Sequence, residues 1–474
     1  MITLYNTLTR RKAPLTPLRD NTVSLYACGL TVYSQPHIGN WVGYIYWDTL
    51  VRLLRHEGYV VHHVQNITDV GHLTSDADDG DDKMEKGARA EGKTAWDIAE
   101  KYSAIAEHEA YDILGLTRPE LRRATDYIAE QIAFAEALEA KGLTYLIPGN
   151  GLYFDTSKLA NYGQLARLDI AGLAAGARVC ATNKRQPTDF AIWKLSPTDR
   201  QRDMEWDSPW GRGFPGWHLE CSTIVQQSLG EQIDIHCGGI DHIPVHHCNE
   251  IAQTESVTGK PLAQVWLHNN HIKVDGRKMS KSLGNIVTLS DVLARGFDAP
   301  AFKLAILSKH YRTEGNFTWD ILAAAQARLN HWRAYAALRH QTHDTLDDDD
   351  DKDEQGGSLL AASRALVEAL SDDLDTPRVV ALIDSSFSRL DTTPLPAIHR
   401  ASLVQFITTI DELLGLSLAE STPDVTDDIK RLLLQRQRAR DEKDWATSDA
   451  LRDTLADQGI AVRDTPSGQI WHYV

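Results

Sequence analysis

The fold is decided by residues 22–67, which read TVSLYACGLTVYSQPHIGNWVGYIYWDTLVRLLRHEGYVVHHVQNI. Thr22–Ala27 is an apolar-rich run of strand length. From Trp41 to Glu57 the apolar residues recur at helical spacing, and Gly58 ends the segment as a helix C-cap would. Tyr59–Ile67 is β-branched and again typical of a strand. Strand, loop, helix and strand make a βαβ unit, which implies a parallel sheet with its ligand crevice at the carboxyl ends of the strands.

A second strand–loop–helix set lies far downstream. Gln232–His236 is strand-like, and a helical pattern follows near Pro244–Val257. Val265–Val274 is a further predicted strand, which ends in a tight-turn signal at Asp275-Gly276. The segment between the two sets holds helical patterns and a Gly/Pro-rich stretch of short strands, near Thr94–Leu114, Ala124–Lys141 and 142–216. The nucleotide-type fold is therefore expected to be split by an insertion.

Helices dominate from about Leu289 onward. The sequence predicts helices and then two short strands at Ile321–Leu338, Leu359–Leu370, Leu403–Leu414, 432–434, Asp444–Leu455, Ile460–Val462 and Gln469–His472. The fold class is thus an α/β Rossmann-like parallel-sheet catalytic domain split by an insertion, followed by a helical bundle and a small α+β C-terminal domain. The predicted bounds are 1–120 and 216–288 for the halves of the catalytic domain, 121–215 for the insertion, 289–325 for a stem-contact region, 326–420 for the bundle and 425–474 for the C-terminal domain.

Composition points to a water-soluble chain of several domains. The chain has 474 residues, of which 42% are hydrophobic and 24% charged. It contains no run of about 18 apolar residues, so no membrane span is expected. Met1–Leu18 lacks the apolar block of a secretory signal, which makes the cytoplasm the expected location.

The net charge of −17 taken alone argues against nucleic-acid binding. The acid is unevenly placed, however, because Asp347–Asp351 is a run of five aspartates that is expected to form a solvated loop. The question of nucleic-acid binding therefore depends on local patches. The five cysteines include no CxxC pair, so they are either buried structural thiols or metal ligands rather than a disulfide framework.

Two segments can handle phosphate. His37-Ile38-Gly39-Asn40 stands just before a predicted helix, where free N–H groups and the helix dipole attract anions. Gly39 lets a ligand approach the backbone, and His37 can donate a hydrogen bond to a phosphoryl oxygen. Alone, such a triplet is usually accidental or a cap.

The second segment is Lys278-Met279-Ser280-Lys281-Ser282, which follows the predicted turn. Two lysines three residues apart can close over a polyphosphate and stabilise the charge that develops on leaving pyrophosphate. One such contact is worth roughly 3–4 kcal/mol. An exposed basic loop is the ordinary interpretation of most lysine-rich segments, but this pentapeptide is specific and its partner lies upstream.

Together the two segments resemble the HIGH and KMSKS signatures of class I aminoacyl-tRNA synthetases, with Asn40 at the position of the second His. The resemblance implies that His37, Asn40, Lys278 and Lys281 are catalytic. It also implies that ATP, with Mg²⁺, is bound by these residues together with Gly39, Gly238 and Asp241.

A metal-ligand set is available near the same crevice. Cys28 ends the first strand, Cys221 lies far downstream, and His246 and Glu250 are four residues apart on one face of a predicted helix. Two thiolates, an imidazole and a carboxylate suit tetrahedral Zn²⁺. From the residues alone a lone histidine such as His246 is more often a satisfied core residue.

Three segments resemble the zinc-ligand segments of cysteinyl-tRNA synthetases, namely 28–33, 216–222 and 246–250. The resemblance implies one Zn²⁺ per chain, held by Cys28, Cys221, His246 and Glu250 in the amino-acid pocket, where it binds the substrate thiol. Zinc favours a soft thiolate over the hard hydroxyl of serine. We therefore expect no editing domain, and the sequence offers no obvious candidate for one.

The same resemblance implies contacts to the substrate cysteine from Gly29, Thr31, Thr68, Trp217 and His236. For Trp217, a plain core aromatic is an equally open interpretation.

Two positions depart from the family pattern. Cys248 stands where the family usually has an acid, and Cys237 replaces a glycine. On a helix Cys248 would point about 200° away from His246, so we expect it to be a spectator. Its service as a replacement for Glu250 is the alternative.

Several cations lie on one predicted helix near the C-terminus. Arg436, Arg440, Trp445 and Asp449 belong to stretches that resemble the family's anticodon-binding domain, which implies contact with tRNA(Cys). Because acids are interleaved, a solvated helix with internal charge pairs is the competing interpretation.

The resemblance implies activation of L-cysteine by ATP to cysteinyl-adenylate, followed by transfer to the terminal adenosine of tRNA, by a monomer with no membrane partner. Two alternatives stay open. One is a ligase of the mycothiol pathway, which shares the core and joins cysteine to an amino sugar but lacks the C-terminal domain. The other is a non-catalytic paralogue that binds tRNA or zinc.

Overall fold

The computed structural model describes residues 1–71, 83–168, 183–199, 201–280, 283–342, 354–465 and 468–473. Cys180, Lys281 and the acidic run Asp347–Asp351 lie outside these ranges. Within them, no helix combines the length and apolar character that crossing a bilayer requires.

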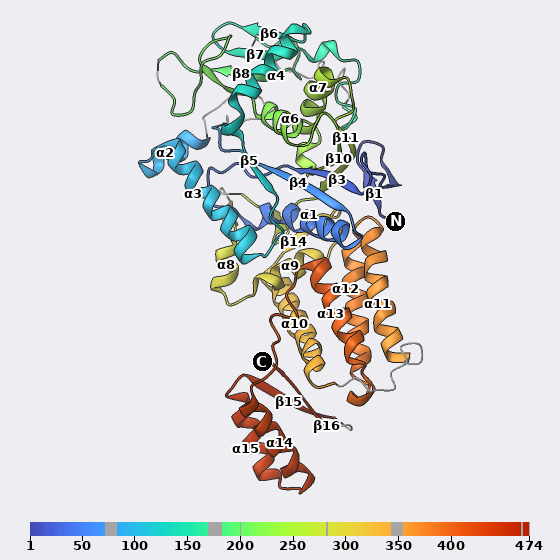
Figure 1. Ribbon diagram of the computed structural model, residues 1–474. Helices are drawn as coiled ribbons and strands as arrows, with labels where there is room; N and C mark the ends of the chain where they lie inside the picture. Colours follow the sequence, from blue (N-terminus) through green and yellow to red (C-terminus); the bar gives the residue numbers. More distant parts are fainter. Residues whose placement is uncertain are drawn as a thin grey trace.

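A five-stranded parallel sheet forms the centre of the molecule (Figure 1). Its strands, in spatial order, are β11 (Ala263–Asn269), β10 (Ile233–Gly239), β3 (Thr22–Ala27), β4 (Val60–Ile67) and β5 (Glu120–Arg123). Every neighbouring pair is parallel. This confirms the predicted sheet and joins its two halves, since β10 from the second half pairs with β3 from the first.

Helix α1 (Ile38–His56) makes the first crossover, from β3 to β4. It buries the apolar stripe that includes Trp41, Ile45 and Leu50 against the sheet. The helix begins three residues before the predicted start, because His37 is its N-cap. It ends as predicted, with Gly58 at a φ of +87°, a left-handed conformation that glycine adopts without strain.

The single strand predicted over Val265–Val274 is wrong. The chain leaves the parallel sheet after Asn269 and forms β12 (Ile272–Val274), which pairs with β13 (Arg277–Lys278) and β14 (Gly315–Phe317). The predicted tight turn is confirmed, because Asp275 and Gly276 have φ values of +50° and +72° and join two antiparallel strands. Both central residues with positive φ make the type of turn that fits strand twist.

The insertion carries its own antiparallel sheet, which lies at the top of Figure 1 with α4 beside it. The elements between the two halves of the parallel sheet are α2 (Lys83–Glu91), α3 (Ala95–Glu107), α4 (Ile128–Ala140), β6 (Thr144–Ile147), β7 (Gly151–Phe154), β8 (Phe190–Leu195), β9 (Gly213–Pro215) and α6 (Trp217–Ser228). Helix α7 (His246–Thr258) then connects β10 to β11.

From about Leu289 onward the chain is mostly helical, as predicted (Figure 1). They are α8 (Leu289–Ala294), α9 (Ala299–Leu307), α10 (Trp319–Ala336), α11 (Glu354–Ser371), α12 (Thr376–Leu390) and α13 (Arg400–Leu414). Helix α12 was not predicted, although Asp375 caps it and Pro377 stands in its first turn. Both are standard signals of a helix start.

The C-terminal unit consists of α14 (Asp427–Asp441), α15 (Trp445–Ala456), β15 (Ile460–Thr465) and β16 (Gly468–Tyr473). It docks on the end of α10 through Gln341, whose side-chain amide donates to the Trp471 carbonyl at 2.9 Å and accepts from the Trp471 N–H at 2.8 Å.

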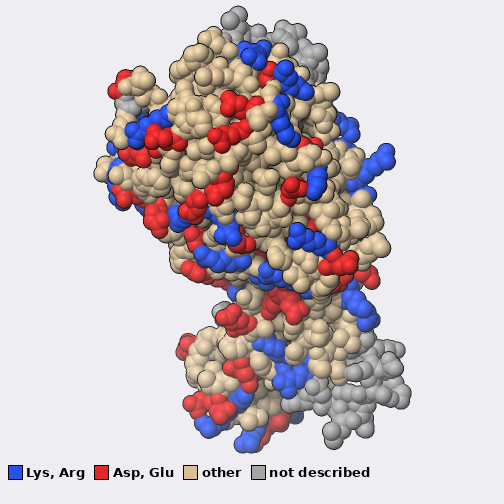
Figure 2. Space-filling model, turned by 45° about the horizontal axis from the view of Figure 1, so that its top comes forward, with Lys and Arg blue, Asp and Glu red and all other residues tan. Residues whose placement is uncertain are grey.

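On the face that Figure 2 shows, basic and acidic side chains are interspersed over the whole length of the molecule. The domain bounds stay predictions, and β5 crosses the one drawn at 120.

Asp373 ties the N-terminal strands to the helical bundle. Its buried carboxylate accepts hydrogen bonds from the Tyr5 N–H at 2.8 Å and the Tyr311 hydroxyl at 2.7 Å, and it pairs with Arg312 at 2.8 Å. Tyr5 belongs to β1 (Thr3–Asn6), which forms a hairpin with β2 (Arg11–Pro14). One carboxylate at position 373 therefore satisfies groups from two other parts of the chain, at residue 5 and at residues 311–312.

Replacing Asp373 with Ala should lower the free energy of unfolding by roughly 3 kcal/mol, because it leaves the buried Tyr311 hydroxyl and the Tyr5 N–H without their acceptor and removes the anion beside Arg312. Urea unfolding followed by circular dichroism measures the loss. Asp372→Ala is the matched control, since Asp372 is 53% exposed in its pair with Lys12 and such pairs contribute about 0–1 kcal/mol. Equal losses in the two variants would contradict this role of Asp373.

Candidate functional site

A cavity of about 1400 Å³ opens at the carboxyl ends of β3 and β10 and at the start of α1. Both phosphate segments border it, although more than two hundred residues separate them in the sequence. Most of the predicted site residues line this cavity, namely Cys28, Gly29, Thr31, His37, Gly39, Asn40, Thr68, Trp217, Cys221, Gly238, Asp241, His246 and Lys278. Lys281 lies outside the described residues.

At one end of the cavity, His37 and Asn40 form the start of α1. The Asn40 side-chain oxygen accepts a hydrogen bond from the His37 backbone N–H at 2.9 Å. Asn40 therefore caps the helix that carries His37, and an amide performs this task without an ionisable group. A β-carbon at Gly39 would lie 3.1 Å from the Met279 methyl group, so the two phosphate segments are in contact there.

Asn285 holds the loop of the second phosphate segment in shape. Its side-chain oxygen accepts from the Ser280 N–H at 2.9 Å, and its amide nitrogen donates to the Lys278 carbonyl at 3.1 Å. This role of Asn285 was not predicted. A single asparagine in a loop has no periodicity, so only its position after Gly284 could have drawn attention to it.

At the other end of the cavity lies a candidate metal cluster. Cys28 follows β3, Cys221 lies on α6, and His246 and Glu250 lie one turn apart on α7. One ligand atom from each of the four residues lies within 4.8 Å of the others. Three elements that are remote in the sequence thus bring together the four ligands that the resemblance implies.

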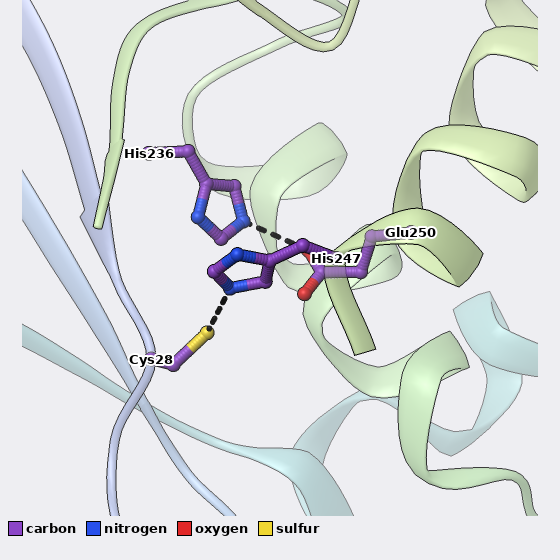
Figure 3. Close-up of side chains that lie close together, drawn as sticks. All are labelled: Cys28, His236, His247 and Glu250. Carbon is purple, nitrogen blue, oxygen red and sulfur yellow. Dashed lines mark hydrogen bonds and ion pairs between the residues drawn. The ribbon is translucent and has the colours of Figure 1, made fainter. Parts of the chain in front are cut away.

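A second set of donors overlaps the first. Cys28, His236, His247 and Glu250 also place their ligand atoms within 4.8 Å of one another (Figure 3). In this set the His247 Nε2 lies 3.4 Å from the Cys28 Sγ, and the His236 Nε2 lies 2.8 Å from Glu250. Neither His236 nor His247 lines the cavity, whereas Cys28, Cys221 and His246 do.

Further histidines surround the first set. His236 approaches the Glu250 Oε2, and the His246 Nδ1 lies 2.9 Å from the His218 Nδ1. Metal-binding imidazoles and carboxylates usually have such partners, which fix their orientation. The structure therefore places His236 behind Glu250, away from the cavity where the resemblance put it. His218 was not predicted, because its partner His246 becomes its neighbour only in the folded chain.

The ionisation of these buried groups is strongly coupled. Burial raises the pKa of Glu250, but His236 and His246 outweigh it and hold the pKa well below its usual range. Burial lowers the pKa of His246, but Glu250 and Cys221 outweigh it and raise the pKa to about 10. The hydrogen bond with Cys28 lowers the pKa of Cys221, whereas burial raises that of Cys28. Glu250 and His246 thus stabilise each other as a carboxylate and a protonated imidazole, and a divalent cation bound there would take the place of that proton.

Cys248 and Cys237 belong to neither donor set. As the helical spacing predicts, Cys248 faces away from His246, and its thiol donates to the Ile243 carbonyl at 3.1 Å. It borders a separate cavity of about 280 Å³ on the other side of α7. Cys237 is fully buried in the apolar core, where burial raises the pKa of its thiol.

The residues predicted to touch cysteine are differently engaged. Trp217, at the start of α6, faces the His246 ring with centroids 4.5 Å apart and lines the cavity. The Thr68 hydroxyl borders the cavity but donates to Glu220 at 3.1 Å. Trp217 therefore lines the cavity instead of lying in the closed core, and its contact with the substrate stays a prediction.

The C-terminal residues separate into buried and exposed ones. Arg436 is fully buried and binds both oxygens of Asp464, at 2.8 and 2.9 Å, so its cation serves to hold the unit together. Arg440 pairs with Asp464 at 3.0 Å and lies 5.5 Å from the ring centroid of Trp445, which is 55% exposed. Asp449 is exposed in an ion pair within its own helix.

Comparison with known proteins identifies two family models along the chain. Residues 14–327 match the class I tRNA synthetase (C) catalytic domain, and residues 422–471 match the cysteinyl-tRNA ligase anticodon-binding domain. The cysteine–tRNA ligase 1 of Burkholderia lata is 48% identical, covering 99% of this chain and 96% of that protein. The cysteine–tRNA ligase of Chlorobaculum tepidum is 39% identical, covering 99% and 98%.

Solved structures share the fold at low sequence identity. The methionyl-tRNA synthetase of Mycobacterium tuberculosis, solved with methionyl-adenylate, aligns with a TM-score of 0.56 at 16% identity, covering 90% of this chain and 96% of that one. The LeuRS of Agrobacterium radiobacter, solved with tRNA and LeuAMS, aligns with a TM-score of 0.61 at 12% identity, covering 87% and 88%. Both alignments confirm the predicted fold class.

Metal content per purified chain, measured by mass spectrometry, distinguishes the two donor sets. We expect Cys221→Ala to lose the metal, because Cys221 belongs to the cavity-facing set alone, and His247→Ala to retain it. Cys248→Ala is the matched control on the far face of α7 and should also retain it. The reverse pattern for Cys221 and His247 would show that the second set binds, and loss only in Cys248→Ala would refute both.

Proposed function

Since this chain belongs to the cysteine–tRNA ligase family of class I aminoacyl-tRNA synthetases, we propose that it attaches cysteine to tRNA(Cys) in two steps on one cavity. L-cysteine and Mg-ATP first give cysteinyl-adenylate and pyrophosphate. The 2′-hydroxyl of the terminal adenosine of tRNA(Cys) then takes the cysteinyl group and releases AMP. The observation that carries this proposal is the cavity itself, which the two phosphate segments and the cysteine-rich donor set share.

In the first step a carboxylate oxygen of cysteine attacks the α-phosphorus of ATP, and the bond to the pyrophosphate oxygen breaks. His37 and the N-terminus of α1 meet the phosphates at one side of the cavity, and Lys278 and Lys281 supply positive charge as pyrophosphate leaves. No protein nucleophile takes part, so the chain contributes position and charge. Gly39, Asn40, Gly238 and Asp241 shape the nucleotide side.

The nucleotide side has little tolerance for larger residues. A β-carbon at Gly239 would lie 2.3 Å from the Asp241 carboxylate, and one at Gly238 would lie 2.6 Å from the His247 ring. Gly238 and Gly239 are the last two residues of β10, and their backbone lies close to the cavity. We infer that this closeness is what lets ATP lie across the strand ends.

The donor set Cys28, Cys221, His246 and Glu250 fits Zn²⁺, because soft thiolates and an imidazole select it over magnesium or calcium. When bound there, zinc supplies a soft Lewis acid that prefers a thiolate substituent to a hydroxyl. Trp217 and His246 face each other beside the place where the substrate side chain would enter. A lost specific contact of this kind can separate two substrates by ~10⁴–10⁵, whereas an apolar pocket gives only ~10–200.

The C-terminal unit provides the proposed contact with the anticodon. Trp445 is exposed, stands beside Arg440, and can stack on a base while the cation meets the backbone. Asp449 adds an acceptor nearby. Arg436 acts from within, by fixing Asp464. The presence of this unit favours tRNA over an amino sugar as the acceptor, and we propose that the chain works as a monomer.

Cysteine-dependent exchange of pyrophosphate into ATP, followed by charging of tRNA(Cys), tests this function directly. We expect exchange with cysteine but not with serine, and transfer of the cysteinyl group to tRNA(Cys). Exchange without charging would favour an amino-sugar ligase. The absence of exchange in zinc-loaded protein would favour a non-catalytic paralogue.

Replacing Lys278 with Ala should lower kcat for pyrophosphate exchange about 10²–10³-fold, because it removes one charge aimed at the leaving group. Metal content should not change, since Lys278 belongs to neither donor set. Arg277→Ala is the matched control, because Arg277 is exposed on the same short strand but does not line the cavity. A similar loss of rate in both variants would contradict a specific role for Lys278.

A further inference from the structure

A chain of buried hydrogen bonds runs beside the candidate metal cluster. The Gly29 N–H donates to the Asn66 side-chain oxygen at 2.7 Å. The Asn66 amide donates to the Thr68 hydroxyl at 2.9 Å, and that hydroxyl donates to the Glu220 carboxylate at 3.1 Å. The chain thus connects the segment after β3, the end of β4 and helix α6.

The two ends of this chain adjoin the two thiol ligands. Gly29 follows Cys28 directly, and Glu220 precedes Cys221 directly. The three side chains of the chain are Asn66, Thr68 and Glu220, with exposed fractions of 2%, 1% and 0%. Water therefore does not compete for these bonds, and a hydrogen bond to a buried carboxylate is among the stronger kinds.

The contact at Gly29 is also tight. A β-carbon at this position would lie 1.7 Å from the Asn66 carbonyl oxygen, so only glycine allows the two segments to meet. The backbone continues the pairing, because the Thr68 N–H donates to the Leu30 carbonyl at 3.0 Å and the Val32 N–H donates to the Thr68 carbonyl at 3.2 Å. The segment that follows Cys28 is thus joined to the end of β4 by backbone hydrogen bonds and also by the chain of side-chain hydrogen bonds.

Helix α6 has a different support. Cys221 and Glu220 sit in its first two turns, and the Thr68 hydroxyl reaches across from β4 to the Glu220 carboxylate. The distance between the two thiols depends on how α6 stands relative to the segment after β3. The chain of Asn66, Thr68 and Glu220 crosses that gap directly.

We propose that Asn66, Thr68 and Glu220 are positioning residues that set the separation of the Cys28 and Cys221 thiols, and with it the affinity of the protein for its metal. The proposal rests on the zinc site of the proposed function. It assigns the Thr68 hydroxyl a structural task besides any contact with substrate. Metal ligands usually depend on such supporting hydrogen bonds, and removing one typically costs 10–100-fold in affinity.

The test is the Zn²⁺ affinity of the full chain, measured without substrate by competition with a chromophoric chelator. Thr68→Val should weaken binding about tenfold or more. Thr68→Ser keeps the hydroxyl and should restore the parental affinity. Thr223→Val is the matched control, because Thr223 is fully buried on the same helix α6 but its hydroxyl has no hydrogen-bond partner among the residues that the structure describes.

A spectrum of the Co²⁺-loaded protein gives a second readout. We expect the ligand-field bands of Thr68→Val to shift from those of the parent, while those of Thr68→Ser and Thr223→Val stay unchanged. Parental affinity and spectrum in Thr68→Val would overturn the proposal. A parent that binds neither ion would overturn the zinc site itself, and this proposal with it.

Glu220→Met cuts the same chain at its other end and serves as an independent variant. Its affinity should also fall, while Glu220→Gln, which keeps an acceptor, should stay near the parent. Adding Thr68→Val to Glu220→Met should cause a clearly smaller loss than it does in the parent, because the bond between the two residues is already absent and only the bond from Asn66 remains to be lost. Additive losses would show two separate roles and contradict the proposal.

Discussion

Burial of two thiols, an imidazole and a carboxylate within 4.8 Å of one another is the constraint on which the rest of the site depends. Isolated buried charges are costly, so such a cluster persists only with partners or a cation. Here the end of β3, α6 and α7 each contribute, and outer histidines approach three of the ligands: His236 lies beside Glu250, His218 beside His246, and His247 beside Cys28. The parallel sheet provides the frame, because its strand ends bring these elements to one edge.

The same edge explains why one cavity can serve two kinds of chemistry. The donor set lies at one end, and the N-terminus of α1 with the Lys278 loop lies at the other. In the proposed function, a substrate whose thiol is held by the donor set directs its carboxylate toward the phosphate segments. Selection of the amino acid and activation of its carboxylate would then take place in different parts of the cavity on a single bound molecule.

Much of this could be predicted from the sequence, because local patterns carry it. Alternating and helical periodicities gave the βαβ unit over 22–67, and the Asp275-Gly276 turn follows from residue types alone. The features that could not be predicted are those that depend on contacts between distant parts of the chain. The strand predicted over Val265–Val274 is interrupted after Asn269 because β12 pairs with β14, and the local sequence does not indicate this pairing. His236 has a sequence position typical of a cavity residue, yet Glu250 draws it behind the ligand set. The sequence around Arg436 is typical of an exposed cation on a helix, but in the structure its guanidinium group binds Asp464 and Gln469.

X-ray absorption at the zinc edge tests the central claim most directly, namely that this cluster binds zinc and through it the substrate thiol. We expect two sulfur neighbours at ~2.3 Å and two nitrogen or oxygen neighbours at ~2.0–2.2 Å in the zinc-loaded protein without substrate. Adding cysteine should introduce one more sulfur neighbour, and adding serine should not. A single sulfur neighbour in the zinc-loaded protein without substrate, or no change with cysteine, would contradict this claim.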